Sequence, residues 1–142
     1  MVREAQAATA AAAADPQIST AAALNLALLL MQRGEFPEAE RLLRQVETTH
    51  PPYTDRVRFN LAGVLAMQAR NQEAEAIFSQ VIEAGDPEEA PGAMTQLAAL
   101  YFRTGRFDES ERLYRQALAA GHPEFTALAA AGLDDIERRR GS

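Results

Sequence analysis

A thirteen-residue segment occurs three times in this chain of 142 residues at nearly even spacing. The first copy begins at Gly34 and reads GEFPEAERLLRQV, and a near duplicate begins at Gly105 and reads GRFDESERLYRQA. A copy with an altered first turn begins at Ala69 and reads ARNQEAEAIFSQV, so the steps are 35 and 36 residues. A fixed period of this length is typical of stacked repeat arrays, in which each repeat buries its apolar face against its neighbours.

Each repeat contains two stretches whose apolar residues have the 3–4 spacing of a buried helical face. The pattern predicts helices over about residues 19–33 and 37–49 in the first repeat, and over about residues 124–139 at the end. Glycine or proline ends these stretches, as at Gly34 and Pro51. In the third repeat Asp86-Pro87 predicts a capped helix start, which Pro91 is expected to delay.

Small residues recur at one position on each helix, where we expect the two helices of a repeat to cross closely. These residues are Ala27, Ala62 and Ala98 on the first helices, and Ala39, Ala74 and Ser110 on the second. Large apolar residues fill the space between the helices, and we also assign Leu29, Leu118 and Leu128 to buried faces. The repeat therefore predicts a core made of leucine and alanine.

The chain contains no cysteine and no lysine, and its fourteen basic residues are all arginine. Disulfides, thiolate metal sites, lysine Schiff bases and P-loops are therefore excluded. The net charge of −6 argues against a nucleic-acid surface, which requires a basic face, and permits at most a basic partner. The arginine- and alanine-rich composition indicates a GC-rich, bacterial coding sequence.

Neither a membrane span nor a leader is expected. The longest apolar run, Ala21 to Met31, is too short to cross a bilayer and is interrupted by Asn25. Alanines and Glu4 follow Arg3 without a leucine-rich segment, so a signal peptide fits poorly. We expect no membrane insertion, and the cytoplasm is the favoured compartment.

The ordered combination of leucine–alanine, glycine–x–phenylalanine, a small residue, a bulky residue and a closing proline resembles the tetratricopeptide repeat. The resemblance places repeats at residues 20–53, 55–88 and 91–124, followed by a capping helix over residues 125–140. It implies an all-α fold, a right-handed superhelical stack of antiparallel helical hairpins, or α-α solenoid. The middle repeat departs from the pattern at Ala69 and Asn71, so its turn is expected to be the softest. The ending at His122-Pro123 is also similar to Sel1-like repeats, but the spacing and the aromatics favour the tetratricopeptide reading.

The first sixteen residues are alanine-rich and leave two alternatives open. Arg3-Glu4-Ala5 precedes Pro37-Glu38-Ala39 by about one period, so residues 1–16 can form the second helix of an incomplete repeat. A disordered leader is the alternative. A loose segment of this kind could also dock on a second copy, which makes a homo-oligomer through residues 1–16 an open hypothesis.

No arrangement of residues indicates catalysis. His50 and His122 lie two repeats apart, so a shared metal ion is not expected and exposed loop histidines are the simpler interpretation. No nucleophile–base arrangement or glycine-rich phosphate loop occurs. Arg56, Arg58, Arg103 and Arg106 could bind a carboxylate or phosphate, although arginines on a solvated helix face are more common. We therefore expect no enzyme, no cofactor and no metal.

The resemblance implies that ligands bind on the concave side, which the first helices line. The candidate residues are Leu24, Asn25, Leu28, Met31, Arg56, Phe59, Asn60, Met67, Gln96, Phe102 and Arg103. Of the clamp that chaperone-binding members use for a peptide carboxylate, only Asn60 matches. Leu24 and Gly92 replace its lysines, so carboxylate capture is not expected.

An apolar groove remains, which suits an amphipathic helix or an extended apolar peptide of a partner protein. Packing of the same residues on neighbouring repeats is the competing explanation. We predict a protein–protein interaction module, of which a secretion chaperone is a narrower form. The alternative is a structural or self-assembly segment of a larger repeat protein.

Overall fold

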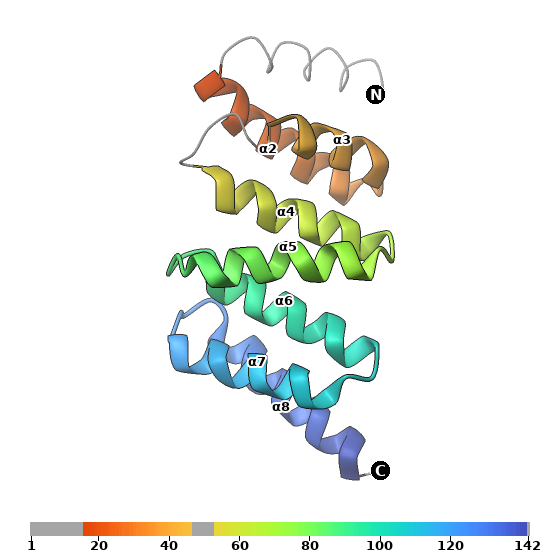
Figure 1. Cartoon of the computed structure of the whole chain (residues 1–142), viewed down its shortest axis with the longest axis vertical. Coiled ribbons are helices and arrows are strands. Elements are labelled where there is room, and N and C mark those ends of the chain that lie inside the picture. Colours follow the sequence, from red (N-terminus) through yellow and green to blue (C-terminus); the bar gives the residue numbers. More distant parts are fainter. Residues whose placement is uncertain (1–15, 47–52, 142) are drawn as a thin grey trace. The chain divides into compact units, whose positions relative to one another are not determined.

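The structure is a computed structural model that describes residues 16–46 and 53–141. Over these residues the chain folds into seven helices joined by turns, with no strand (Figure 1). The predicted all-α fold is therefore confirmed. The chain divides into two compact units, Met1–Ala74 and Glu75–Ser142, which are described separately below.

The first unit contains the helices α2 (Pro16–Gln32), α3 (Phe36–Val46) and α4 (Thr54–Met67), and the start of α5 (Asn71–Ala84). Helix α3 packs against both α2 and α4, and α2 also contacts α4. The predicted small residues Ala27, Ala39 and Ala62 are fully buried at these contacts. Leucines and valines fill the rest of the core, including Leu30, Leu42, Leu43, Val57, Leu61 and Leu65.

The turn between the two helices of a repeat has the same backbone form in all three repeats. The second residue after the first helix is left-handed, with φ of 76° at Gly34, 61° at Ala69 and 81° at Gly105. The next amide donates back across the helix end, from Glu35 to the carbonyl of Leu30 at 2.9 Å. Ala69 is the one described residue other than glycine with positive φ, and its Cβ makes this conformation unfavourable.

The second unit continues α5 from Glu75 and contains α6 (Ala90–Arg103), α7 (Phe107–Ala120) and α8 (Thr126–Gly141). Helix α7 packs against α6 and α8, and α6 contacts α8. Their core is the cluster of Ala90, Met94, Ala98, Tyr114, Ala117, Ala129 and Ile136. Ser110 fits this core because its buried Oγ donates to the carbonyl oxygen of Ala98 at 2.7 Å.

Helix α8 approaches α7 closely at a glycine. A Cβ on Gly132 would lie 2.3 Å from Cζ of Tyr114, so only glycine leaves room for that ring. The face of α8 that corresponds to the α7-facing stripe of α6 is different. Met94, Ala98 and Phe102 of α6 correspond, 36 residues later, to Ala130, Asp134 and Arg138, all of which are exposed. This stripe of α8 is a solvated surface.

Several boundaries and burial predictions need correction. Helix α2 begins at Pro16 rather than near residue 19, because proline is compatible with the first helical turn. Asp86 does not cap α6 directly; its carboxylate accepts the amides of Glu88 at 2.8 Å and Glu89 at 3.3 Å, and the helix starts at Ala90. The delay predicted from Pro91 is thus confirmed.

Three leucines predicted to be buried, Leu29, Leu118 and Leu128, are exposed. Leu118 and Leu128 lie next to a buried alanine and Leu29 lies two residues from one, so each is turned away from the buried side by about 100° or 200°. Residues 1–15 lie outside the described residues, so the incomplete repeat and the oligomer through residues 1–16 remain predictions.

Candidate functional site

The predicted binding residues of the first unit lie on α2 and α4, two helices that contact each other. Leu28 is 43 % exposed and Met67 is 63 % exposed, so both present apolar surface to solvent. Met31 and Phe59 are half-buried, and Asn25 and Arg56 are exposed. On α4, Arg56, Phe59, Gly63 and Met67 share one side of the helix, since they follow the 3–4 spacing. We call this surface of α2 and α4 the first-helix face.

Two of the predicted binding residues contribute little to this face. Leu24 and Asn60 are each only 7 % exposed, so they lie beneath the first-helix face and offer little surface to a ligand. Asn60 is also the one residue that matches the carboxylate clamp, and its burial agrees with the expectation that such capture does not occur. Among the predicted binding residues of the first unit, Leu28 and Met67 therefore offer the most exposed apolar surface.

In the second unit the predicted binding residues lie on α6. Gln96 and Arg103 are exposed, whereas Phe102 is half-buried. The Phe102 ring packs edge-to-face on Phe107 of α7, with 5.4 Å between centroids. The guanidinium of Arg139 on α8 lies 5.8 Å from the Phe102 ring and 5.9 Å from the Phe107 ring. Phe102 therefore helps to hold α6, α7 and α8 together.

The arginines considered as anion ligands have different environments. Arg106 is engaged by Glu75 at 3.0 Å and by Glu109, and its guanidinium lies 4.2 Å from the centre of the Tyr101 ring. Arg58 is half-buried, and its Nε is buried without a hydrogen-bond partner. Arg106 is thus committed to ion pairs within its own unit.

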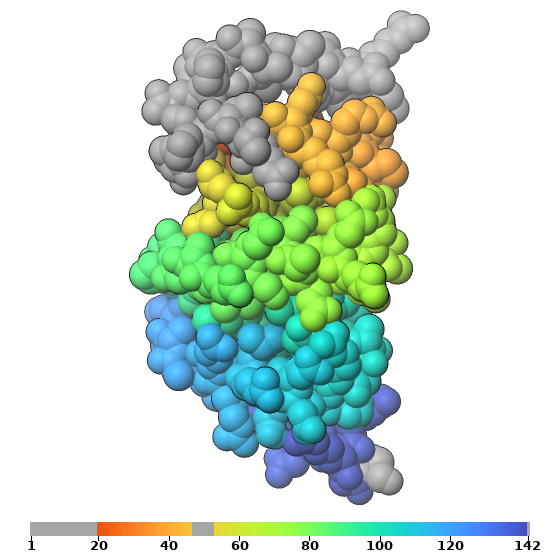
Figure 2. Space-filling view, viewed as in Figure 1, coloured from red at the N-terminus to blue at the C-terminus, as the bar shows by residue number. Residues whose placement is uncertain are grey.

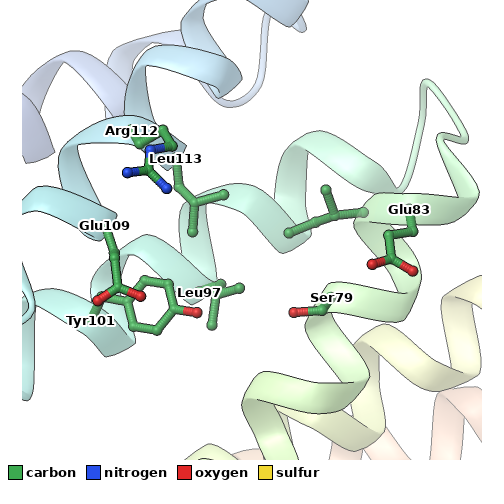
Figure 3. Close-up of a pocket in the computed structure, with 8 residues that line it drawn as sticks. Ser79, Glu83, Leu97, Tyr101, Glu109, Arg112 and Leu113 are labelled. Atoms are coloured by element: carbon green, nitrogen blue, oxygen red, sulfur yellow. The ribbon is translucent and has the colours of Figure 1, made fainter.

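A hollow of about 210 Å³ lies between α5 and α7 in the second unit, above α6 (Figure 3). The lining residues are Ser79, Ile82 and Glu83 of α5, Leu97 and Tyr101 of α6, and Glu109, Arg112 and Leu113 of α7. Its centre is apolar, and Figure 3 shows Glu83 and Arg112 on opposite sides. Sequence reasoning missed this hollow, because it depends on how two second helices pack.

The histidine predictions have mixed outcomes. His50 lies outside the described residues, and His122 is half-buried rather than exposed. The amide of Glu124 donates to Nδ1 of His122 at 3.2 Å, which leaves Nε2 to contact Glu88 at 3.3 Å.

Among the described residues no three side chains of the metal-binding types gather at one point. None of the described helices combines the length and apolar character that a membrane crossing requires.

Comparison with protein families gives matches along most of the chain. One tetratricopeptide repeat model matches residues 2–53 and 24–93, and a second matches residues 92–121. The first alone covers more than half of the chain. The chain belongs to the tetratricopeptide repeat family. A comparison with curated protein sequences finds no match.

Solved structures with a similar fold are also found. One is the crystal structure of PcrH in complex with the chaperone-binding region of PopD. It superposes with a TM-score of 0.71 at 20 % sequence identity, over 83 % of this chain and 90 % of the PcrH chain. At this identity the likeness shows the fold, which confirms the predicted class of helical-hairpin solenoids.

The tetratricopeptide repeats of this chain share a set of ion pairs that sequence reasoning missed. A glutamate of the second helix, Glu40 or Glu75, contacts the arginine that opens the next second helix, Arg70 at 2.7 Å or Arg106 at 3.0 Å. The third equivalent, Glu111, contacts Arg140 of α8 at 2.7 Å. We call these pairs the inter-repeat clasps. Aligning the repeats shows the glutamates at matching positions, which is the signal that could have found them.

The first tetratricopeptide clasp contains additional donors. Glu40 also accepts hydrogen bonds from Arg44 at 2.9 Å and Gln68 at 3.0 Å. Burial raises the pKa of Glu40, but the hydrogen bonds from Gln68, Arg44 and Arg70 together outweigh burial, so the pKa is lowered.

The second clasp contains a phenol. The Tyr101 hydroxyl donates to Glu75 at 2.7 Å, and burial followed by this hydrogen bond raises the pKa of Tyr101 to about 12.

Proposed function

We propose that this tetratricopeptide repeat chain is a protein–protein interaction module that holds a partner's apolar peptide or amphipathic helix on the first-helix face. The observation that carries the proposal is the exposure of Leu28 and Met67 on two contacting helices. Exposed apolar side chains that lie together on a surface are a common mark of partner sites. Methionine suits such a site because its flexible thioether adapts to different apolar partners.

The charge of the first-helix face supports the same function. Helix α2 contains no charged residue, and α4 contains Asp55, Arg56 and Arg58 near its start. A partner that lies along α2 therefore loses little hydration of charged groups on binding. We propose a binding role without catalysis.

The structure of PcrH with a bound region of PopD supports the proposal by analogy, since it pairs this fold with a peptide of another protein. A chaperone that keeps an apolar segment of its partner covered is the narrower form of the proposed function. The exposed residues of α6, Gln96 and Arg103, are proposed to contribute to the same activity.

A peptide-display selection on the full chain tests the function. Peptides enriched on the wild-type protein are expected to be apolar, and Leu28→Glu or Met67→Glu should each weaken their binding by about tenfold or more, because a buried unpaired carboxylate is costly. Fluorescence anisotropy with the enriched peptides gives the affinities. These two sites are better targets than Phe102, whose ring also holds the helices of its own unit together.

Leu128→Glu provides the matched control, because Leu128 is an exposed leucine on α8 outside the first-helix face. Its substitution should leave the affinities unchanged, and circular dichroism should show the same helicity for all three variants. Equal binding by wild-type, Leu28→Glu and Met67→Glu proteins would contradict the proposal.

A further inference from the structure

The second helix of the middle repeat differs from its two counterparts in charge. Helix α3 carries Arg41 and Arg44, and α7 carries Arg112 and Arg115 at the equivalent positions. Helix α5 has Ala76 and Ser79 there, and it contains three glutamates without a basic residue. The middle repeat thus lacks two arginines that the other repeats have.

In the flanking repeats three of these four arginines pair with carboxylates of their own helix. Arg41 contacts Glu38 at 3.0 Å, and Arg44 contacts Glu40 at 2.9 Å. Arg115 lies 3.8 Å from Glu111. These pairs give α3 and α7 local charge balance, which α5 has to obtain from elsewhere.

Two glutamates of α5 obtain that balance from neighbouring segments, and one does not. Glu73 is paired with Arg70, and Glu75 with Arg106. Among the described residues no cation pairs with Glu83, which is exposed in the last turn of α5. A carboxylate at a helix C-terminus is also unfavourable next to the negative end of the helix dipole. A cation beside Glu83 would relieve both effects.

On its α5 side the hollow between α5 and α7 is lined by Ser79, which stands where Arg115 lines a hollow between α7 and α8. Ser79 and Glu83 form its α5 wall, together with Ile82, and Leu97 of α6 and Leu113 of α7 line its apolar part (Figure 3). Arg112 stands on the opposite wall. The outer surfaces of α5, in green, and α7, in cyan to blue, face the viewer in Figure 2.

The net negative charge of the second unit favours a basic partner. The second unit contains twelve carboxylates and seven arginines, a net charge of −5, whereas the first contains eight and seven, a net charge of −1. An electronegative surface attracts basic partners and orients them on approach.

We propose that this hollow is a second docking surface, which takes an arginine or lysine of a partner's amphipathic helix. The aliphatic stem of that residue lies on Ile82, Leu97 and Leu113, and its charge pairs with Glu83. Arg112 on the other wall pairs with an acidic side chain next to that residue on the same partner helix, and this second contact sets the direction of the helix. The surface consists of second helices, so it does not depend on the first-helix face.

Fluorescence anisotropy on the full chain tests the proposal with two labelled probes. The first is a short alanine-based helical peptide with two leucines one turn apart and an arginine beside them. The second has glutamate in place of the arginine. The arginine peptide should bind more tightly, and Ser79→Arg should weaken its binding by about tenfold because it adds a positive charge to the α5 wall of the hollow. Glu83→Gln should weaken it by several-fold.

Ala76→Arg is the matched control, since it adds the same charge to an exposed position of α5 that does not line the hollow. Its effect should stay below about twofold, as expected for an exposed charge. Equal losses in Ser79→Arg and Ala76→Arg would overturn the proposal, as would equal binding of the two peptides or no binding of the arginine peptide. Leu28→Glu should leave this binding unchanged, which separates the result from a failure of the first-helix face.

Discussion

The first and second inter-repeat clasps place a glutamate at the same position of the repeat and satisfy it with different donors. Glu40 in the first unit accepts from Arg44, Arg70 and Gln68. Glu75 in the second unit accepts from Arg106 and from the phenol of Tyr101. The difference follows from three substitutions in the repeat, since Leu65 stands where Tyr101 does, Ser79 where Arg44 does and Thr104 where Gln68 does.

This comparison shows that the repeats keep the position of a half-buried glutamate but not the kinds of side chain that donate hydrogen bonds to it. The first clasp depends on three charged or amide side chains, whereas the second combines one guanidinium with a ring that the same guanidinium covers at 4.2 Å. The first clasp also follows a turn with a left-handed alanine, and the second follows a turn with a left-handed glycine. The two units should therefore respond differently to equivalent substitutions.

The largest expected difference comes from removing each glutamate. Glu40→Ala should lower the free energy of unfolding by about 2 kcal/mol, because three donors, two of them charged, lose their acceptor at a site where the side chain is 14 % exposed. Glu75→Ala should cost about 1 kcal/mol, since its side chain is 31 % exposed and water can replace it. Urea denaturation measures both. Equal losses, or a larger loss at Glu75, would show that the donor sets are equivalent.

Substitutions in the turns should change the free energy of unfolding by a smaller amount, upward in the middle repeat and downward in the third. Ala69→Gly should raise the free energy of unfolding by about 1 kcal/mol, because glycine adopts positive φ without a Cβ clash. Gly105→Ala should lower it by about 1 kcal/mol for the same reason, although nothing lies within 4 Å of the added Cβ. Thermal denaturation of the two variants is a direct check. A destabilised Ala69→Gly variant would mean that the strain at Ala69 is absent.

The smallest effect appears at high pH and belongs to the second clasp alone. Tyr101 has a folded-state pKa of about 12, above the value of about 10 expected in the unfolded chain. Its contribution is fully present below about pH 10 and is lost as the pH rises toward 12, because the unfolded chain releases the proton first. In Tyr101→Phe the decline in unfolding free energy over this range should be shallower. If the unfolding free energy of Tyr101→Phe fell as steeply with pH as that of the wild-type protein, the Tyr101 phenol would not contribute to the clasp.

The repeated positions explain what the sequence could predict. Ala27, Ala62 and Ala98 are all fully buried, as are Ala39, Ala74 and Ser110, because each set occupies one position that the stacking of helices encloses. The helix ends at Gly34 and Gly105 could also be predicted, because glycine permits the left-handed turn.

Features that depend on the neighbouring helix could not be read from periodicity. Leu29 and Leu128 are apolar, yet they are exposed because no described helix covers their side of α2 or α8. Glu40 and Arg70 look like ordinary surface charges on a single helix, and only the packed hairpins bring them to 2.7 Å. The partner's chemistry has no direct signal in the sequence, so the candidate site could be predicted only as an apolar face.

The solvated stripe of α8 has a practical consequence for protein engineering. Another helical hairpin fused behind α8 would remove Asp134 and Arg138, which pairs with Asp135, from water, at a cost of several kcal/mol. Helix α6 supplies the template for a compatible junction in Met94, Ala98 and Phe102. Ala130→Met, Asp134→Ala and Arg138→Phe would give α8 the apolar stripe on which another hairpin can pack.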